Sequence, residues 1–262
     1  MLLLKYKSFP QIHAHRGLAE EAPESTLSAF RLAVESGVDG VEFDLHYTRD
    51  CNIVVHHDYY LGRTNDGDGL ISDKTYDEIY ALDAGSWFDN KYAGEKIPLF
   101  SEVLVLLKNR CKLEVQLASL TENFINEVVD MIEQNKMLQQ VEITSSFPHV
   151  LMKVRQYHPD IKIGVFLPVE QWMLDNLWCL HALQTMSLIH ANVAHIPNQM
   201  LNEDNVSRLK RSGYIVHASD CNDIVQLSKA VDLGVHQLST DKVKQAFSYK
   251  ESILSCFGEP SE

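Results

Sequence analysis

Short apolar segments rich in β-branched residues alternate with segments of helical period along most of the chain. The strand-like segments are 11–15, 40–46, 111–118, 140–146, 162–167, 189–196, 214–219 and 236–239. Between them, the helical period places Leu27, Phe30 and Ala33 on one face of segment 25–36, and a similar face recurs in 121–135. Such alternation is typical of parallel βα units.

Residues at the ends of the helical segments fit the positions at which helices begin and end. Thr26 and Thr121 are candidate N-caps, because their side-chain oxygens can accept a hydrogen bond from the first turn. Gly37, Gly213 and Gly234 are candidate helix stops, because glycine tolerates the left-handed backbone found there.

Eight strand-like segments would be enough to close a (β/α)8 TIM barrel. An open doubly wound sheet would give a similar pattern, so the periodicity alone does not choose between them. Residues 59–98 fit neither element type and are rich in Gly, Asp and Tyr, which predicts an insertion carried on the barrel rim. No linker divides the chain, and we expect residues 1–262 to form a single domain.

Composition and charge narrow the possible partners. The chain has 262 residues, of which 45% are hydrophobic, and a formal net charge of -13 without a Lys/Arg cluster. A nucleic-acid partner is therefore not expected, since phosphate backbones require a positive footprint. An anionic substrate would need a metal ion or a placed arginine.

Cysteines and apolar segments bear on the cellular compartment. The five cysteines are scattered and form no CxxC motif, which favours free thiols in a reducing compartment. The apolar run at the N-terminus is too short for a signal peptide, and no segment is long enough to span a bilayer. We therefore expect a cytoplasmic protein, and the sequence leaves its oligomeric state open.

Two acidic residues interrupt the second apolar segment. Glu42 and Asp44 are two residues apart and should share one face of a strand, with Val41, Phe43 and Leu45 on the other face. Neighbouring carboxylates resist burial unless a positive group lies between them, and a hard cation such as Mg²⁺ or Ca²⁺ meets that need. The alternative is a solvated face of an edge strand, which the apolar flanks make less favourable.

A third acid stands in a similar position. Glu114 shares a strand face with Gln116 inside the apolar segment 111–118. By itself it is weak evidence, but successive barrel strands would place it near Glu42. Glu114 therefore gains significance only if its strand neighbours the strand that holds Glu42, as a succession of βα units would allow.

The end of the first strand carries residues suited to phosphate chemistry. His15 and Arg16 stand where the strand gives way to a loop, and active sites of barrels lie at that end of the strands. A histidine can act as a general acid or base near neutral pH, and an arginine can hold a phosphate through two nitrogens. Gly17 permits a sharp turn there. His13 should point the same way as His15, but deeper in the barrel.

A histidine doublet follows the acidic strand. His56 and His57 cannot face the same way in extended chain, so one should point at the site and the other away from it. Alternation does not say which. His46 is a further candidate because it shares the face of Glu42 and Asp44. The other histidines are expected to be structural, and no dinucleotide, P-loop, nucleophile-elbow or HExxH motif is present.

Taken in order, these segments resemble the glycerophosphodiester phosphodiesterase family over nearly the whole chain. The matching segments are HRG at 15–17, APESTLSAF at 22–30, VEFDLHYTRD at 41–50, IVVHHD at 53–58, RTNDGDGLISDKTYDEIYALDAGSWF at 63–88, IPLFSEVLVLL at 97–107, LEV at 113–115, SSFPHVLMKVRQYHP at 145–159 and LGVHQLSTD at 233–241.

The resemblance implies a TIM barrel with a small insertion after the second barrel strand. It further implies hydrolysis of glycerophosphodiesters to sn-glycerol 3-phosphate and an alcohol, with one bound Mg²⁺ or Ca²⁺. Carried over by position, the implied metal ligands are Glu42, Asp44 and Glu114. The residues that match the remaining roles are His15 and His57 for acid/base catalysis, Arg16 for the phosphate, and Gln116 and Asp58 for supporting contacts.

Three positions depart from the family pattern. Ser25 replaces an asparagine, Gln116 replaces a lysine near the phosphate, and Ser219-Asp220 replaces a Trp-Thr pair near the glycerol end. Two alternatives follow: a phospholipase D-type lyase that stops at a cyclic phosphate, and a weakly active barrel that binds phosphate esters. The lyases of that kind carry a loop disulfide, which Cys51 alone does not supply.

Overall fold

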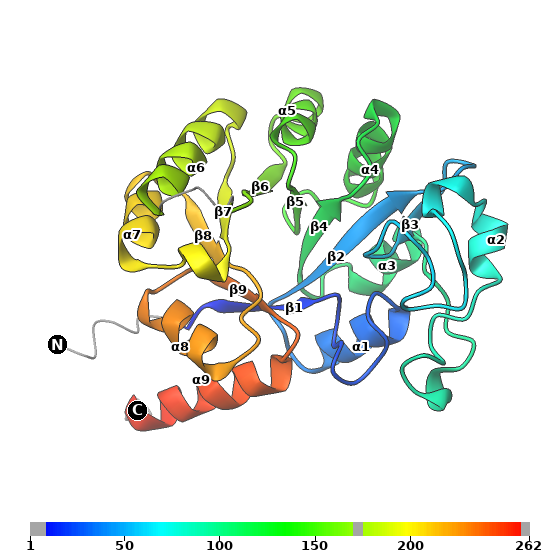
Figure 1. The fold of residues 1–262 in the computed structure, drawn as a ribbon, viewed down its shortest axis with the longest axis horizontal. Helices are drawn as coiled ribbons and strands as arrows, with labels where there is room; N and C mark the ends of the chain where they lie inside the picture. Colours follow the sequence, from blue (N-terminus) through cyan, green and yellow to red (C-terminus); the bar gives the residue numbers. More distant parts are fainter. Residues whose placement is uncertain (1–8, 170–174, 258–262) are drawn as a thin grey trace.

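The computed structural model describes residues 9–169 and 175–257 and forms a closed barrel (Figure 1). Within these residues, eight parallel strands make up the barrel wall. They are β1 (Gln11–His15), β2 (Gly40–Tyr47), β4 (Lys112–Leu117), β5 (Val141–Ser145), β6 (Lys162–Phe166), β7 (Val193–Ile196), β8 (Ile215–Ala218) and β9 (Gln237–Thr240). They pair in sequence around the wall, and β1 closes the circle by pairing with both β2 and β9. The predicted TIM barrel is confirmed, and the open sheet is excluded.

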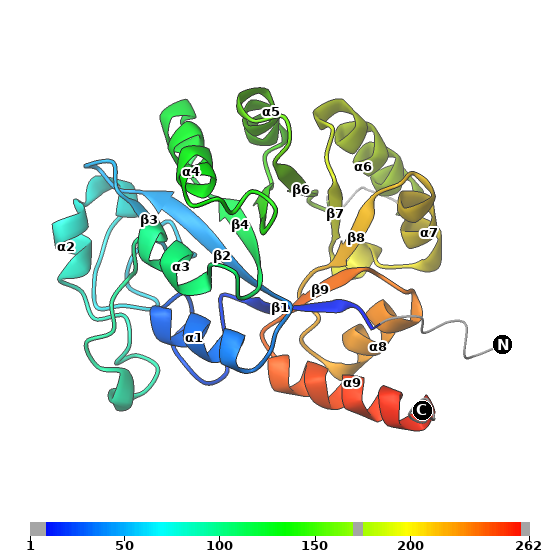
Figure 2. The same cartoon turned by 180° about the vertical axis from the view of Figure 1, so that it is seen from behind.

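Helices cover the outside of the wall, as the front and back views show (Figures 1 and 2). They are α1 (Leu27–Glu35), α3 (Phe100–Leu107), α4 (Glu122–Gln134), α5 (Pro148–Tyr157), α6 (Asp175–Ile189), α7 (Glu203–Arg211), α8 (Ile224–Asp232) and α9 (Val243–Phe257). The side chain of Thr26 accepts a hydrogen bond from Ala29 N, which confirms the first predicted cap. Thr121 is the N-cap residue of α4, but its side chain makes no capping hydrogen bond. Gly37, Gly213 and Gly234 follow helix ends with positive φ, as expected.

One predicted strand is shorter than expected. Segment 189–196 contains a strand only from Val193, because Ile189 ends α6 and the next residues close that helix. Ala191 N donates to Met186 O at 2.9 Å, and His190 has φ 52°. This apolar segment therefore contains a helix end, a turn and a strand. The alternation of side chains along the sequence cannot separate these three parts.

Apolar and polar residues are segregated between the two faces of the barrel wall. Phe43 on β2 faces outwards, since its ring lies 5.5 Å from Phe30 of α1 and 6.1 Å from Phe100 of α3. The interior carries a buried polar set instead. Its titratable members with less than 5% exposure include His13, Glu42, Asp44, Glu114, Glu142, His195 and His217. Burial of so many titratable groups is costly unless they satisfy one another or bind an ion.

An insertion extends beside β2 (Figure 1, cyan). β3 (Ile53–Val55) pairs antiparallel with β2, and the chain returns to the barrel at α3. The intervening chain contains α2 (Tyr76–Tyr80) and two 3-10 turns, η2 (Ile71–Asp73) and η3 (Asn90–Tyr92); a further turn, η4 (Asn198–Met200), follows β7. The insertion has its own apolar cluster, formed by Val54, Leu61, Ile71, Ile79, Ala84 and Ile97.

The structure bears on two features from which the compartment was predicted, namely membrane-spanning segments and cysteines. None of the helices in the described part of the chain is long and apolar enough to cross a membrane. The cysteines whose side chains are described, Cys51, Cys111, Cys179 and Cys221, are free thiols. Cys256 lies outside the described side chains.

Candidate active site

The barrel register brings the predicted residues together from three adjacent strands. His15 on β1 is the register partner of Glu42 on β2, and Glu42 is in turn the partner of Glu114 on β4. His15, Glu42, Glu114 and His57 all line one small cavity of about 180 Å3. The acids therefore do not belong to a solvated edge, because Glu42, Asp44 and Glu114 are each at most 3% exposed.

His15 is held on one ring nitrogen by a carboxylate. Its Nδ1 lies 2.7 Å from Asp241 Oδ1, just beyond β9, and its Nε2 lies 3.7 Å from Glu42 Oε2. Burial lowers the pKa of His15, but Glu42 and the hydrogen bond to Asp241 outweigh burial and raise that pKa to about 9. Asp241 is itself fixed by Asn222 Nδ2 at 2.6 Å. Nε2 is thereby left for proton exchange in the cavity.

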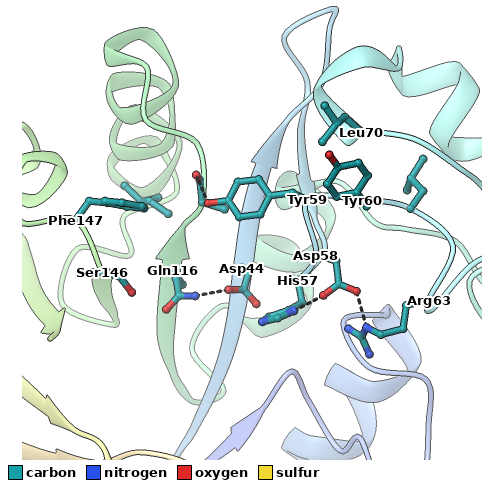
Figure 3. A pocket seen from close by; sticks show the side chains of 13 residues that line it. Asp44, His57, Asp58, Tyr59, Tyr60, Arg63, Leu70, Gln116, Ser146 and Phe147 are labelled. Carbon is teal, nitrogen blue, oxygen red and sulfur yellow. Dashed lines mark hydrogen bonds and ion pairs between the residues drawn. The ribbon is translucent and has the colours of Figure 1, made fainter. Parts of the chain in front are cut away.

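His57, in the loop that follows β3, has a similar arrangement. Its Nδ1 lies 2.7 Å from Asp58 Oδ1, and Asp58 Oδ2 accepts from Arg63 Nε at 2.5 Å (Figure 3). Burial acts to raise the pKa of Asp58, but the hydrogen bonds from Arg63 and His57 lower it to about 2. Asp58 is therefore a carboxylate near neutral pH and can orient the His57 ring.

His56 points away from the cavity into the insertion. Its Nδ1 lies 2.9 Å from Asp58 O, so that nitrogen must be the donor. Its Nε2 then accepts from Thr64 Oγ1 at 3.2 Å and from Asn65 Nδ2 at 3.1 Å. Burial lowers the pKa of His56, which agrees with a neutral ring. The predicted division of the doublet is therefore present in the geometry.

The three buried carboxylates fit a cation. Burial, followed by repulsion from Asp44, raises the pKa of Glu42 well above its usual range, and burial also raises the pKa of Asp44. Gln116 Nε2 donates to Asp44 Oδ1 at 2.6 Å, whereas the buried Asp44 Oδ2 lacks a hydrogen-bond partner. A hard divalent ion prefers such oxygens and would remove the repulsion.

Glu114 also belongs to a second cluster deeper in the barrel. One ligand atom from each of His13, Glu114 and His217 lies within 4.8 Å of the others, and all three residues are buried. Glu114 Oε2 is 3.1 Å from His13 Nδ1 and 3.4 Å from His217 Nδ1, and Oε1 is 3.4 Å from His195 Nδ1. This mixed nitrogen and oxygen set is of the kind that binds zinc rather than magnesium or calcium.

An ion-pair chain continues below that cluster. His195 Nε2 lies 2.7 Å from Glu142 Oε1, and Lys162 Nζ lies 3.0 Å from Glu142 Oε2. Burial acts to raise the pKa of Glu142, but the hydrogen bond to His195 and the charge of Lys162 lower it to about 2. The pKa of His195 is raised by Glu114 and Glu142 against the opposing effect of burial. The barrel interior is therefore an extended network of paired charges that supports Glu114 from beneath.

Arg16 stands at the mouth of the cavity in a strained conformation. Its φ is 58°, and its backbone N donates to Glu42 O at 3.0 Å. Its Nη1 donates to Glu24 Oε1 at 3.0 Å. Left-handed backbone at a residue other than glycine often marks a functional position. At Gly17, which has φ 84°, a Cβ would lie 2.8 Å from Ala29 of α1, so only glycine fits this turn.

Of the residues that support the two histidines, Asp58 was predicted to make supporting contacts, whereas Asp241, Glu24 and Arg63 were not singled out. These three lie inside segments 233–241, 22–30 and 63–88, which match the family only as whole segments. Arg63 donates to both Asp58 and Glu24, so it joins the His57 side to the Arg16 side. A polar residue directly after a barrel strand was the available signal for Asp241.

The positions that depart from the family pattern are also in or near the cavity. Gln116 and Ser219 line it, and Ser219 Oγ is buried without a hydrogen-bond partner. Ser25 lies behind Arg16, with its N donating to Arg16 O at 2.9 Å and its φ at 59°. The cations Arg16 and Arg63 are each paired with Glu24.

Comparison with known proteins identifies the family of this chain. Residues 15–245 match the model of the glycerophosphoryl diester phosphodiesterase family. A glycerophosphodiester phosphodiesterase of Caldanaerobacter subterraneus subsp. tengcongensis is 36% identical over 166 residues, which is 61% of this chain and 68% of that protein. One from Bacillus subtilis is 28% identical and covers 89% of this chain and 86% of its own.

Solved structures give the same result for the fold. An Oleispira antarctica phosphodiesterase, in complex with the product sn-glycerol 3-phosphate, superposes with a TM-score of 0.83 and 29% identity, over 94% of this chain and 99% of that one. A glycerophosphodiester phosphodiesterase from Agrobacterium tumefaciens has a TM-score of 0.79 at 21% identity, over 92% and 100% of the two chains. The family match runs from the last residue of β1 to α9 and includes every predicted site residue, and the chain belongs to the glycerophosphoryl diester phosphodiesterase family.

Proposed function

We propose that this protein hydrolyses glycerophosphodiesters to sn-glycerol 3-phosphate and an alcohol, with His15 and His57 as the acid/base pair. The observation that carries the proposal is the matched support of the two rings. Asp241 holds Nδ1 of His15 and Asp58 holds Nδ1 of His57, each at 2.7 Å, beside three buried carboxylates. Family membership and the product bound in the Oleispira relative support the same reaction.

The proposed roles follow from the positions of the groups. One histidine removes the proton of the attacking hydroxyl through Nε2, and the other gives a proton to the departing alcohol. Arg16 orients the phosphate, for which it must exchange its contact with Glu24 or share it. The nucleophile we expect is the glycerol 2-hydroxyl, with the resulting cyclic phosphate opened by water.

We assign a divalent cation, Mg²⁺ or Ca²⁺, to Glu42, Asp44 and Glu114. When bound, it would neutralise the phosphodiester and lower the pKa of the attacking hydroxyl. The unpartnered Asp44 Oδ2 and the raised pKa of Glu42 support this carboxylate set. The deeper His13, Glu114 and His217 set is a competing location with a preference for Zn²⁺.

The test measures glycerol 3-phosphate release from glycerophosphocholine and glycerophosphoethanolamine, with EDTA and after adding back Mg²⁺, Ca²⁺ or Zn²⁺. We expect EDTA to abolish release and Mg²⁺ or Ca²⁺ to restore it. His15→Ala and His57→Ala should each lower kcat by about 10²–10⁴-fold, the usual range for a lost acid or base. His181→Ala, an exposed histidine on α6, is the matched control and should retain wild-type kcat.

The outcomes separate the alternatives. A cyclic phosphate that persists would identify a lyase, and tight product binding without turnover would identify a weakly active binding barrel. Full activity of either histidine variant would refute the acid/base assignment. Restoration by Zn²⁺ but by neither Mg²⁺ nor Ca²⁺ would move the cation to the deeper cluster.

A further inference from the structure

A groove of about 650 Å3 opens beside the small cavity and shares two of its residues. Both are lined by His57 and Gln116, so the groove begins where the reacting phosphate would lie. From there it runs between β4 and the insertion (Figure 3). Its walls are mainly aromatic and aliphatic, formed by Tyr59, Tyr60, Leu70, Leu117 and Phe147.

The central aromatic wall is held in place. Tyr59 Oη donates to Ala118 O at 3.0 Å, which ties the loop after β3 to the end of β4. Its ring meets the edge of the His46 ring at 4.9 Å between centroids. Figure 3 shows Tyr59 lying across the groove above the Gln116–Asp44 pair. The central part of the apolar surface, formed by Tyr59, is therefore preformed.

This apolar surface remains open to water in the protein alone. Tyr59, Tyr60 and Phe147 are 52%, 63% and 40% exposed. Three large aromatic side chains grouped beside a reactive site are unlike the scattered exposed apolar residues that most surfaces carry. A hydrocarbon chain bound against these side chains would remove apolar surface from water, which is favourable.

The charged groups at the groove already have partners. Asp58 is paired with both His57 and Arg63, and Arg63 is further paired with Glu24. One oxygen of Asp44 accepts from Gln116, and the other is the proposed cation ligand. A cationic head group would therefore find aromatic faces, but no carboxylate free to balance its charge. The aliphatic Leu70 and Leu117 favour an uncharged occupant.

Size distinguishes the two spaces. The cavity of about 180 Å3 is polar and suits glycerol and phosphate, whereas the groove is more than three times larger. Choline or ethanolamine would leave most of the groove filled with water. We propose that the groove binds the alcohol half of the substrate, and that this alcohol carries an uncharged hydrocarbon chain. This inference rests on the proposed phosphodiesterase function.

The test uses a series of sn-glycerol 3-phosphate esters of ethanol, butanol, hexanol and octanol, together with glycerophosphocholine. The alkanols leave with nearly equal intrinsic ease, so differences in kcat/KM report binding in the groove. Each methylene removed from water should raise kcat/KM about two- to fourfold, which gives at least ~60-fold over the six methylenes between the ethyl and octyl esters. All esters are used as monomers in solution with saturating Mg²⁺ or Ca²⁺.

Variants of residues that line the groove test whether the increase in kcat/KM comes from binding there. Phe147→Ala and Tyr60→Ala remove exposed side chains and should not disturb folding, and each should reduce the octyl-to-ethyl ratio about three- to tenfold. The matched control is Tyr80→Ala, an exposed aromatic on α2 that does not line the groove, which should leave the ratio unchanged.

Two results would overturn the inference while hydrolysis itself proceeds. One is equal kcat/KM along the series, and the other is a preference for glycerophosphocholine over the octyl ester. No hydrolysis of any ester would refute the proposed function and this inference together.

Discussion

At the scale of single residues, neighbours in the sequence have opposite roles. His57 lines the cavity with an Nδ1 contact to Asp58, whereas His56 is 3% exposed and bonded within the insertion. The side-chain alternation of an extended chain sends them to opposite sides. What decides their chemistry is the partner on each ring: a carboxylate holds His57, and a backbone carbonyl and two neutral side chains hold His56.

This difference predicts a pH dependence for His56→Gln. Near pH 7.5 the free energy of unfolding of the variant should be about 1–3 kcal/mol lower than that of the wild type, because buried hydrogen bonds are lost or weakened. Below about pH 6.5 the unfolded chain protonates His56, whereas the folded chain resists because burial lowers this pKa. The free energy of unfolding of the wild type therefore decreases as the pH falls, because His56 becomes protonated on unfolding. The variant lacks this histidine and so lacks this contribution.

Urea unfolding at pH 7.5, 6.5 and 5.5 would measure this effect. The difference in unfolding free energy between wild type and His56→Gln should shrink as the pH falls. His181→Gln, at an exposed position on α6, should show no such trend. A difference that stays constant or grows toward pH 5.5 would contradict a neutral, buried His56.

At the scale of elements, glycines on the strands make room for the polar interior. A Cβ at Gly40 of β2 would lie 2.6 Å from the His13 ring. A Cβ at Gly164 of β6 would overlap Glu142 Oε1 and lie 2.6 Å from His195 Nε2. A strand glycine usually weakens a sheet, and here it allows the close approach of charged side chains from neighbouring strands.

Gly164→Ala should therefore destabilise the barrel. Overpacking against Glu142 and His195 should cost about 1–3 kcal/mol, because both side chains are buried and held together at 2.7 Å. Thermal unfolding by circular dichroism is the measurement. Gly94→Ala is the control: its Cβ meets nothing within 4 Å, and a left-handed alanine costs only about 1 kcal/mol. Equal melting temperatures for Gly164→Ala and wild type would argue against the tight Glu142–His195 contact.

At the scale of the whole molecule, charge opposes the proposed substrate. The net charge of -13 creates a long-range field that repels a phosphodiester. Arg16 in the cavity and Arg63 in the groove beside it are both paired with Glu24. The local attraction must therefore come from the bound cation and from exchange of these pairs. Salt screens the long-range repulsion more than it screens contacts inside the cavity.

We therefore expect kcat/KM for an ester of net negative charge, such as the ethyl ester, to rise about two- to threefold between 20 and 200 mM salt. Zwitterionic glycerophosphocholine should respond less, and the cation is kept saturating at both salt concentrations. A fall in kcat/KM of the ethyl ester with salt would mean that local positive charge dominates its approach.

The structure differs from the sequence prediction where one apolar segment contains parts of more than one element. Segment 189–196 reads as a single strand, yet Ala191 closes α6 before β7 begins at Val193. Similarly, His195 and His217 read as ordinary structural residues. His195 and His217 are 81 and 103 residues away from Glu114 along the chain, and local periodicity carries no information on contacts at that distance.

The sequence by itself determined the alternation of strands and helices, the shared face of Glu42 and Asp44, and the split of the histidine doublet. These depend on the periods of local backbone geometry, and each is written in consecutive residues. Tertiary structure alone decided that Asp241 would hold His15, that Arg63 would join Asp58 to Glu24, and that the aromatic groove would open beside Gln116. Those contacts exist only because barrel closure brings β9 and the insertion to the strands that carry the histidines.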